Sequence, residues 1–381
     1  MNLPVYLDYA ATTPTDPRVA ARMADCLTVH GNFGNPASRS HAYGWRAEEA
    51  VEEARAQVAK VLNADVREII WTSGATESDN LAIKGPALAA AGQRHIVTTS
   101  VEHKAVLDTC AYLETLGHEV TYVEPDAHGR VVADDIAAVL REDTLLVSVM
   151  HVNNELGTIN DIAEIGNLCK RKNVIFHVDA AQSFGKIEID VGRLNIDLLS
   201  VSAHKIYGPK GAGFLYVRRE PPLAMTPLIH GGGHEMGLRS GTLATHQIVG
   251  LGTASTLMAD HMHEEQARLS MLREQFMRHV QQIPDTVLNS HPDFNLPSIV
   301  NVGFGGVDGE TLLLALDDIA VSSGSACTSA SVEPSYVLKA VGVADDIAHA
   351  SLRFSFGRFS TEEDIDHAGR RIAEVVGRLR T

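Results

Sequence analysis

The sequence predicts an α/β protein in which a mostly parallel sheet of seven strands carries helices on both faces, with a smaller α+β domain beside it. Three observations predict this fold. Between about residues 65 and 220, short β-rich runs alternate with helical stretches, which is typical of a doubly wound sheet. One long helical pattern follows this region, and shorter strand and helix patterns fill the rest of the chain.

The predicted strands are short apolar runs bounded by polar or turn residues. They are expected at 68–72, 95–99, 119–123, 145–150, 174–178, 198–201 and 213–217. Intervening helices are expected where apolar residues recur every three or four positions, at 77–91, 104–116 and 163–172. An earlier amphipathic helix, at 39–62, is expected outside the sheet. Ligands of such sheets bind at the carboxyl ends of the strands.

The second part of the chain begins after a glycine-rich stretch at 231–241. A long helix is expected at 246–282, ending before Pro284, and we expect it to bridge two domains. Beyond it, strands are expected at 299–304, 320–322 and 351–356, and helices at 310–316, 335–341 and 361–379. We therefore place a large domain at 15–260 and a small α+β domain at 1–14 and 261–381.

Composition and charge exclude several classes of protein. The formal net charge of -16 leaves no basic excess for binding phosphates, so a nucleic-acid partner is not expected. The apolar runs end well before the roughly 20 residues needed to span a bilayer. The N-terminus has neither the basic region nor the apolar core of a signal peptide. We expect a cytoplasmic protein that binds neither DNA nor a membrane.

The cysteines and histidines show no metal-binding pattern. The four cysteines lie far apart and without a CxxC pair, which predicts reduced thiols: Cys26, Cys110, Cys169 and Cys327. Three of them lie in helical, largely apolar contexts, whereas Cys327 lies in a loop of small residues, 322–329. No HExxH motif accompanies the histidines that suggest a metal, namely His151, His177, His230 and His234. We predict no metal site.

Two charged residues follow two of the predicted strands. Asp179 ends the strand at 174–178, and Lys205 follows the strand at 198–201. Taken singly, the aspartate could cap a helix and the lysine could be a solvated loop residue. Pyridoxal phosphate requires a lysine amine for its Schiff base and a carboxylate that keeps its ring nitrogen protonated. Together the two residues predict a pyridoxal-phosphate site.

The phosphate of this cofactor needs hydrogen-bond donors, which the start of a helix provides. Residues 72–77 form a strand end, a turn and a helix start, so we expect the Ala75 amide and Thr76 to bind the phosphate. The alternative is an ordinary helix capped by Ser73. The chain lacks a GxxxxGK[ST] motif, and the glycines at 208–213 do not open a helix, so ATPase and dinucleotide-dehydrogenase interpretations lose support.

Motifs along nearly the whole chain closely resemble the cysteine desulfurases of the iron-sulfur-cluster assembly type, a class V aminotransferase-like family. These are DYAATTP (8–14), GATES (74–78), EHK (102–104), NNE (153–155), HK (204–205), RSGT (239–242) and SSGSACTS (322–329). The resemblance implies a pyridoxal-5′-phosphate-dependent transferase of fold type I and an obligate homodimer. It also implies conversion of L-cysteine to L-alanine, with the sulfur passing through a Cys327 persulfide to acceptors for iron-sulfur cluster assembly and tRNA thiolation.

The resemblance also implies a role for each matching residue. Cys327, Lys205 and His103 are the expected catalytic residues, and Asn154 and Arg353 the expected contacts of the substrate carboxylate. The expected cofactor-binding residues are Ala75, Thr76, His103, Asp179, Gln182, Ser202, His204, Lys205 and, reaching the phosphate of the partner subunit, Thr242.

An iron-sulfur scaffold protein is an implied partner, with Cys327 a transient cluster ligand when the scaffold is bound. The chain closes at Thr381 directly after its last helix, whereas relatives commonly continue with a short tail that helps to dock the scaffold. We therefore do not extend the expectation of docking through such a tail to this chain. Two rival functions are a selenocysteine lyase or transaminase-like enzyme of the same fold, and a non-catalytic docking platform for sulfur-trafficking proteins. Cys327 and the joint presence of Lys205, Asp179 and His103 argue against both.

Overall fold

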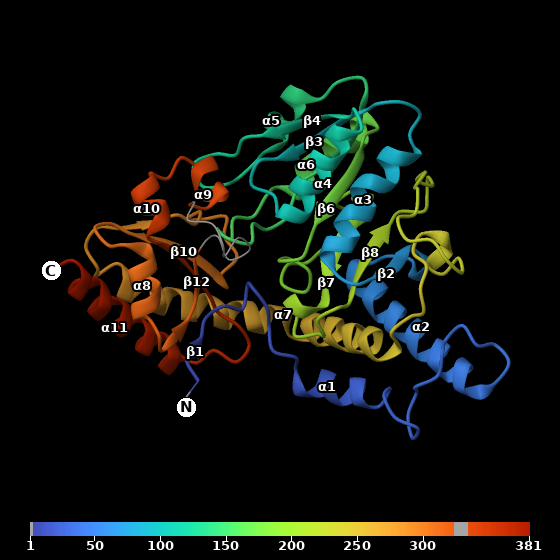
Figure 1. Cartoon of the computed structure of the whole chain (residues 1–381), viewed down its shortest axis with the longest axis horizontal. Helices are drawn as coiled ribbons and strands as arrows, with labels where there is room; N and C mark the ends of the chain where they lie inside the picture. Colours follow the sequence, from blue (N-terminus) through green and yellow to red (C-terminus); the bar gives the residue numbers. More distant parts are fainter. Residues whose placement is uncertain (1–2, 324–333) are drawn as a thin grey trace.

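The computed structural model describes residues 3–323 and 334–381 (Figure 1). All the predicted strands of the first part form and join one seven-stranded sheet of order β2-β8-β7-β6-β5-β3-β4. Their bounds are β2 (Ile69–Thr72), β3 (His95–Thr99), β4 (Glu119–Val123), β5 (Thr144–Ser148), β6 (Ile175–Asp179), β7 (Leu198–Ser202) and β8 (Gly213–Val217). Only β8 runs antiparallel to its neighbours. The mostly parallel seven-stranded sheet is confirmed.

Helices cover both faces of this sheet because neighbouring residues of each strand point to opposite sides. Ile70 and Ile96 pack in a core with α3 (Ala75–Ala89) and α4 (Lys104–Thr115). The residues next to them, Trp71 and Val97, pack in another core. That second face is covered by α2 (Ala42–Leu62), α5 (Ala133–Val139), α6 (Ile162–Lys172) and the first half of α7 (Thr245–Val280). The doubly wound arrangement is confirmed.

The long helix α7 packs against two different cores and runs from one to the other (Figure 1). Leu251 and Met258 belong to the core of the large sheet, whereas Leu272 and Phe276 belong to a core farther along the chain. That core is formed by α8 (Gly309–Ala315), α11 (Glu362–Leu379) and an antiparallel sheet of order β12-β13-β10-β9. The sheet consists of β9 (Thr286–Leu288), β10 (Ile299–Phe304), β12 (Ser322–Ser323) and β13 (Ser351–Ser355), and α9 (Tyr336–Ala340) and α10 (Asp345–His349) pack nearby.

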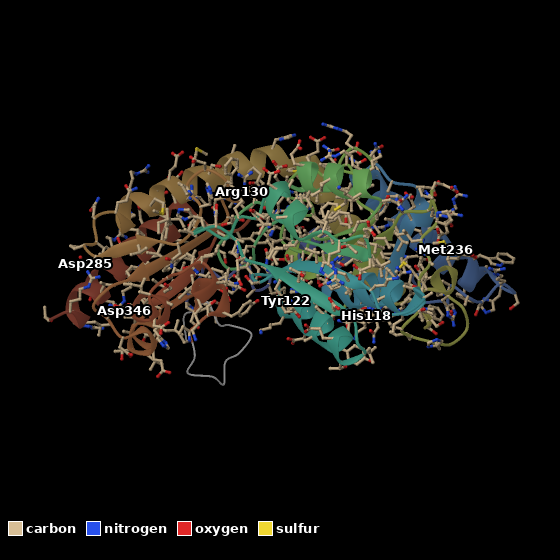
Figure 2. All side chains as sticks on the ribbon, turned by 90° about the horizontal axis from the view of Figure 1, so that it is seen from above. His118, Tyr122, Arg130, Met236, Asp285 and Asp346 are labelled. Carbon is tan, nitrogen blue, oxygen red and sulfur yellow. The ribbon has the colours of Figure 1, made fainter. Side chains whose placement is uncertain are left out.

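The start of the chain lies with this second core. The strand β1 (Val5–Tyr6) pairs with β11 (Ile319–Ala320), and Leu7 is fully buried in the core. The single strand expected at 320–322 is therefore wrong, because β11 and β12 pair with different partners. Figure 2 shows Asp285 and Asp346 at this end of the molecule, and His118 and Met236 toward the other end.

Several short elements were not expected from the sequence: β1, β9, α5, α10 and the helix α1 (Pro17–Ala24). The division at residues 14 and 260 stays a prediction. None of the helices in the described part of the chain has an apolar stretch long enough to cross a membrane.

Candidate active site

A cavity of about 580 Å³ lies at the carboxyl ends of the strands of the large sheet. Of the residues predicted for the site, Cys327 lies outside the described residues, and Thr242 is exposed and does not line the cavity. All the others do: Ala75, Thr76, His103, Asn154, Asp179, Gln182, Ser202, His204, Lys205 and Arg353. The structure therefore brings together residues that are up to 278 positions apart (353 − 75).

Lys205 and Asp179 enter this cavity from adjacent strands. Asp179 is the last residue of β6, and Lys205 closes the short helical turn 203–205 that follows β7. The amine of Lys205 donates to the carbonyl oxygens of Ala10 (2.6 Å) and Ala11 (2.9 Å). The first segment of the chain thus holds the amine over the sheet edge, and its two carbonyls are partners that the sequence did not reveal.

Asp179 carries a charge that the protein compensates only in part. Burial raises its pKa, while the Ala181 amide, which donates to its Oδ1 (2.8 Å), and the charges of His103 and Lys205 act in the opposite direction. Burial and the neighbouring Asp179 raise the pKa of fully buried Asp79 well above its usual range. A protonated ring nitrogen would place a compensating positive charge beside this carboxylate. Asp179 therefore fits the pyridine ring of the cofactor.

A layer of hydrogen bonds below Asp179 fixes the sheet edge. His177 bridges Ser148 (2.8 Å) on β5 and Ser200 (2.9 Å) on β7 through its two ring nitrogens. Burial lowers the pKa of His177 to about 3, so the ring is neutral at physiological pH. Among the described residues, no group of three or more histidine, cysteine or acidic side chains could hold a metal ion. His177 connects three strands directly behind the aspartate.

The start of α3 suits a phosphate group. Its N-cap is Gly74 (φ 151°), which provides no side-chain cap. Ser73, the cap of the alternative interpretation, is therefore not the N-cap, although its amide donates to the Glu77 side chain (2.8 Å). The first amides of a helix have no partners within the helix and attract anions. Ala75 and Thr76 stand in this first turn and line the cavity, so they fit the cofactor's phosphate.

His103 lies at the start of α4. Its Nδ1 accepts a hydrogen bond from the Ala105 amide (3.1 Å), so the neutral ring carries its proton on Nε2. The preceding Glu102 joins the ends of β3 and β5, because it accepts from Thr99 Oγ1 (2.9 Å) and the Met150 amide (2.8 Å). Burial raises the pKa of Glu102 to about 8. His103 itself caps α4 through Nδ1 and also lines the cavity, so its two expected roles are compatible.

Arg353, on β13 of the antiparallel sheet, and Asn154, in the segment between β5 and α6, also line the cavity. The guanidinium of Arg353 bonds to Asp8 Oδ1 (2.8 Å) and to the Asn154 carbonyl (2.9 Å). Within the described residues, its Nε and the Asn154 Oδ1 are buried and have no hydrogen-bond partner. Buried polar atoms are rarely left unpaired, and such an exception at a cavity favours a ligand. A substrate carboxylate would suit the guanidinium.

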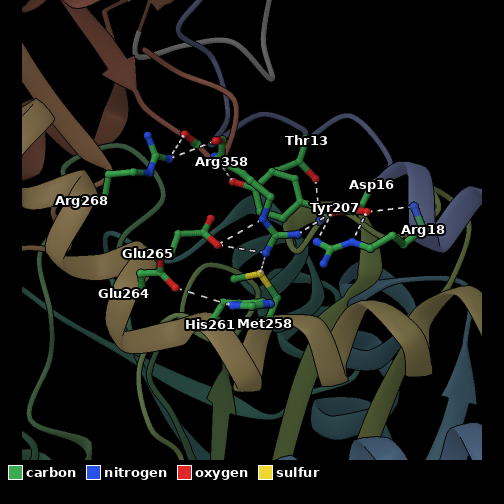
Figure 3. A network of polar contacts seen from close by, with 11 residues as sticks. Thr13, Asp16, Arg18, Tyr207, Met258, His261, Glu264, Glu265, Arg268 and Arg358 are labelled. Carbon is green, nitrogen blue, oxygen red and sulfur yellow. Dashed lines mark hydrogen bonds and ion pairs between the residues drawn. The ribbon is translucent and has the colours of Figure 1, made fainter. Parts of the chain in front are cut away.

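A polar network ties the segment after Lys205 to the second core (Figure 3). Tyr207 has a left-handed backbone (φ 63°), and its amide donates to Thr13 Oγ1 (2.8 Å). Its hydroxyl accepts from the Arg358 amide (2.6 Å), and the Arg358 guanidinium lies 4.3 Å from its ring centre. The same guanidinium bonds to Asp16 (2.8 Å) and Glu265 (2.9 Å). Sequence reasoning missed this network because its members lie far apart in the chain.

Comparisons with known proteins agree with this geometry. The family model described as Aminotransferase class-V matches residues 5–367. Cysteine desulfurase IscS of Pseudomonas aeruginosa (strain LESB58) is 59% identical over 381 residues, which is 100% of this chain and 94% of that protein. The protein of the same name from Stutzerimonas stutzeri (strain A1501) is 60% identical, with the same coverage of both chains.

Solved structures show the same relationship. One described as a NifS-like protein matches with a TM-score of 0.91 and 37% identity, covering 99% of this chain and 100% of its own. Another, described as SspA in complex with cysteine, has a TM-score of 0.84 and 40% identity, covering 93% and 99%. The chain therefore belongs to the class-V aminotransferases and, within them, to the pyridoxal-phosphate-dependent cysteine desulfurases of the iron-sulfur-cluster assembly type.

Proposed function

We propose that the chain converts L-cysteine to L-alanine and transfers the sulfur to Cys327 as a persulfide. One observation carries this proposal: a single cavity combines a lysine amine, a buried carboxylate, the start of a helix and a guanidinium. The first three suit the three functional parts of pyridoxal phosphate. The guanidinium of Arg353 suits the carboxylate of an amino acid.

The residues of the cavity divide the work of the reaction. Bound pyridoxal phosphate withdraws electrons from the substrate and so weakens its bonds at Cα and Cβ. Arg353 and Asn154 hold the substrate carboxylate, and the amine of Lys205 moves the Cα proton. His103 provides a second proton carrier at Nε2. The Cys327 thiolate takes the sulfur, so that the Cβ–S bond breaks, an S–S bond forms, and the carbon skeleton leaves as alanine.

The other cysteines are poor candidates for the nucleophile. Cys26, Cys110 and Cys169 are all buried free thiols. Burial raises the pKa of Cys110 and of Cys169 to about 12, and it also raises the pKa of Cys26. Since the thiolate is the reactive form, these positions favour Cys327. Free thiols also suit the reducing cytoplasm in which we place the protein.

A homodimer is part of this proposal. Thr242, expected to reach the phosphate of the partner subunit, is exposed in the single chain. Large apolar side chains are also exposed around the start of α2: Leu27, Val29, Phe33, Tyr43 and Trp45. Exposed apolar side chains in such number favour an interface. A two-fold symmetric dimer would bury the same side chains on both subunits. As sulfur acceptors we propose an iron-sulfur scaffold protein and the proteins of tRNA thiolation.

The experiment is a product assay on the purified holoprotein. With L-cysteine and a thiol reductant, we expect alanine and sulfide in equal amounts. Cys327→Ala should keep the visible absorption of the cofactor and lose alanine release, whereas the control Cys26→Ala should keep both. A coloured protein that releases neither product, or undiminished alanine from Cys327→Ala, would contradict the proposal.

A further inference from the structure

The side-chain amide of Gln182 is bonded at both of its ends. Its Nε2 donates to the carbonyl oxygen of Ala10 (2.9 Å), and its Oε1 accepts from the amine of Lys186 (3.3 Å). A protonated lysine amine can only donate and a carbonyl oxygen can only accept, so only one orientation of the amide satisfies both partners. Gln182 is almost fully buried and lines the cavity.

This orientation turns the NH₂ group toward the catalytic amine. The same Ala10 carbonyl that accepts from Gln182 also accepts from Lys205 Nζ (2.6 Å). Two donors therefore converge on one carbonyl oxygen at the cavity wall. The Gln182 oxygen faces away from it, toward Lys186.

Lys186 itself lies on the far side of Gln182 from the cavity. It is partly buried and lines a small cavity of about 10 Å³ with Tyr9, Tyr207 and Glu265. Burial lowers its pKa to about 8, against the opposing charge of Glu265. Lysines are seldom placed in such surroundings without a partner. The partner that the structure gives Lys186 is the Gln182 oxygen.

We propose that Lys186 is a positioning residue that holds the Gln182 amide as a hydrogen-bond donor toward the phenolic oxygen of pyridoxal phosphate. This inference rests on the proposed function and on the family resemblance, which implies that Gln182 bonds the phenolic oxygen of the cofactor. An ionised phenolic oxygen accepts hydrogen bonds, so the NH₂ group stabilises it. A flipped amide would present its own oxygen to it and repel it. Lys186 prevents this flip without touching the cofactor.

The inference predicts a shift in the pH dependence of the resting holoenzyme. A donor to the phenolic oxygen favours its anionic form, so losing that donor raises the pH midpoint of the cofactor's visible absorption band. The other charged and titratable groups that line the two cavities beside Gln182 and Lys186 are Lys205, His103, Asp179, His204, Glu77, Lys210, Arg353, Glu265, Tyr9 and Tyr207. None of these residues is altered in the variants below, so their contributions stay in place.

The test is a double-mutant cycle read from this midpoint, without turnover. We expect Lys186→Met to raise the midpoint by about one pH unit, a tenfold change in proton affinity. In a Gln182→Ala background the same substitution should add almost nothing. Lys186→Arg, whose guanidinium can only donate, like the lysine amine, should leave the midpoint near the wild-type value. Lys84→Met is the matched control, because Lys84 bonds to the Asn80 side-chain oxygen (2.7 Å) away from the cavity.

The measured midpoints show whether Lys186 acts through Gln182, acts through its charge alone, or has no role. An unchanged midpoint in Lys186→Met, or an equal shift with and without Gln182, would overturn the inference, the second because charge alone would then explain the effect. If Lys186→Met does not fold, Lys186→Gln decides, because its amide can also accept and so no longer fixes the Gln182 amide; an unchanged midpoint in this variant would overturn the inference. Wild-type protein that shows no visible band with added pyridoxal phosphate would instead refute the proposed function.

Discussion

The two sides of the active-site cavity are built in different ways. On one side, Asp179 and Lys205 stand at the ends of neighbouring strands of one sheet, and His177 fixes that edge from behind. On the other side, Arg353 comes from the antiparallel sheet and meets Asp8, 345 positions away in the sequence. The cofactor side is a continuous scaffold, whereas the substrate side is assembled from separate segments.

Both sides also contain buried polar atoms without hydrogen-bond partners. On the cofactor side, the Lys205 amine and one Asp179 oxygen have partners within the chain, but both oxygens of the neighbouring Asp79 have no hydrogen-bond partner among the described residues. On the substrate side, Arg353 Nε and Asn154 Oδ1 are likewise buried without a partner in the described part of the chain. Each such atom costs about 1–3 kcal/mol, which a ligand could offset. We infer that the substrate carboxylate supplies the missing partner of Arg353 Nε.

The largest effect is expected from a substitution on the cofactor side of the cavity. Lys205→Ala removes the amine that carries the cofactor and moves the Cα proton, so turnover should fall by about 10²–10⁴-fold or more. The visible absorption of the protein-bound Schiff base should disappear, as a spectrum after dialysis against pyridoxal phosphate would show. Lys210→Ala is the control, because Lys210 lines the same cavity and should leave the band intact. A band that survives in Lys205→Ala would mean that another lysine carries the cofactor.

A smaller effect is expected from a substitution on the substrate side, which should weaken substrate binding without affecting the cofactor. Arg353→Met removes the guanidinium that faces the substrate carboxylate, a loss of about 3 kcal/mol for a charge-assisted hydrogen bond. We therefore expect kcat/KM for L-cysteine to fall about 10²-fold, mainly through KM, while the visible band stays unchanged. Steady-state kinetics and a spectrum check this. Arg371→Met, on α11 and bonded to Asp318 (3.1 Å), is the control. Loss of the band in Arg353→Met would show that the two sides are not independent.

The sequence predicted the cofactor side well for a physical reason. Continuous apolar runs with clear ends specify buried strands, and parallel strands end at one edge, so Asp179, Ser202 and Lys205 had to lie close together. The short helices α1, α5 and α10 were missed because helices of five to eight residues depend on tertiary packing rather than on propensity. In α1 and α5, that packing is made by Val19 and Ile136.

The substrate side was predicted only through the family resemblance. No local pattern shows that Asp8 bonds to Arg353, or that Asp16 bonds to Arg358 across 342 positions. Gln182 and Lys186 are only four residues apart, yet the orientation of the Gln182 amide also depends on the Ala10 carbonyl from the start of the chain. Such contacts exist only once the two cores have packed together.

The Cys327 persulfide can be tested directly by locating the transferred sulfur on the protein. The holoprotein is incubated with L-cysteine in the absence of reductant, digested, and analysed by mass spectrometry together with the alanine released. We expect one added sulfur on the peptide that contains Cys327 and one alanine for each sulfur retained. Alanine release with the sulfur on Cys26, Cys110 or Cys169, or on no cysteine at all, would contradict it.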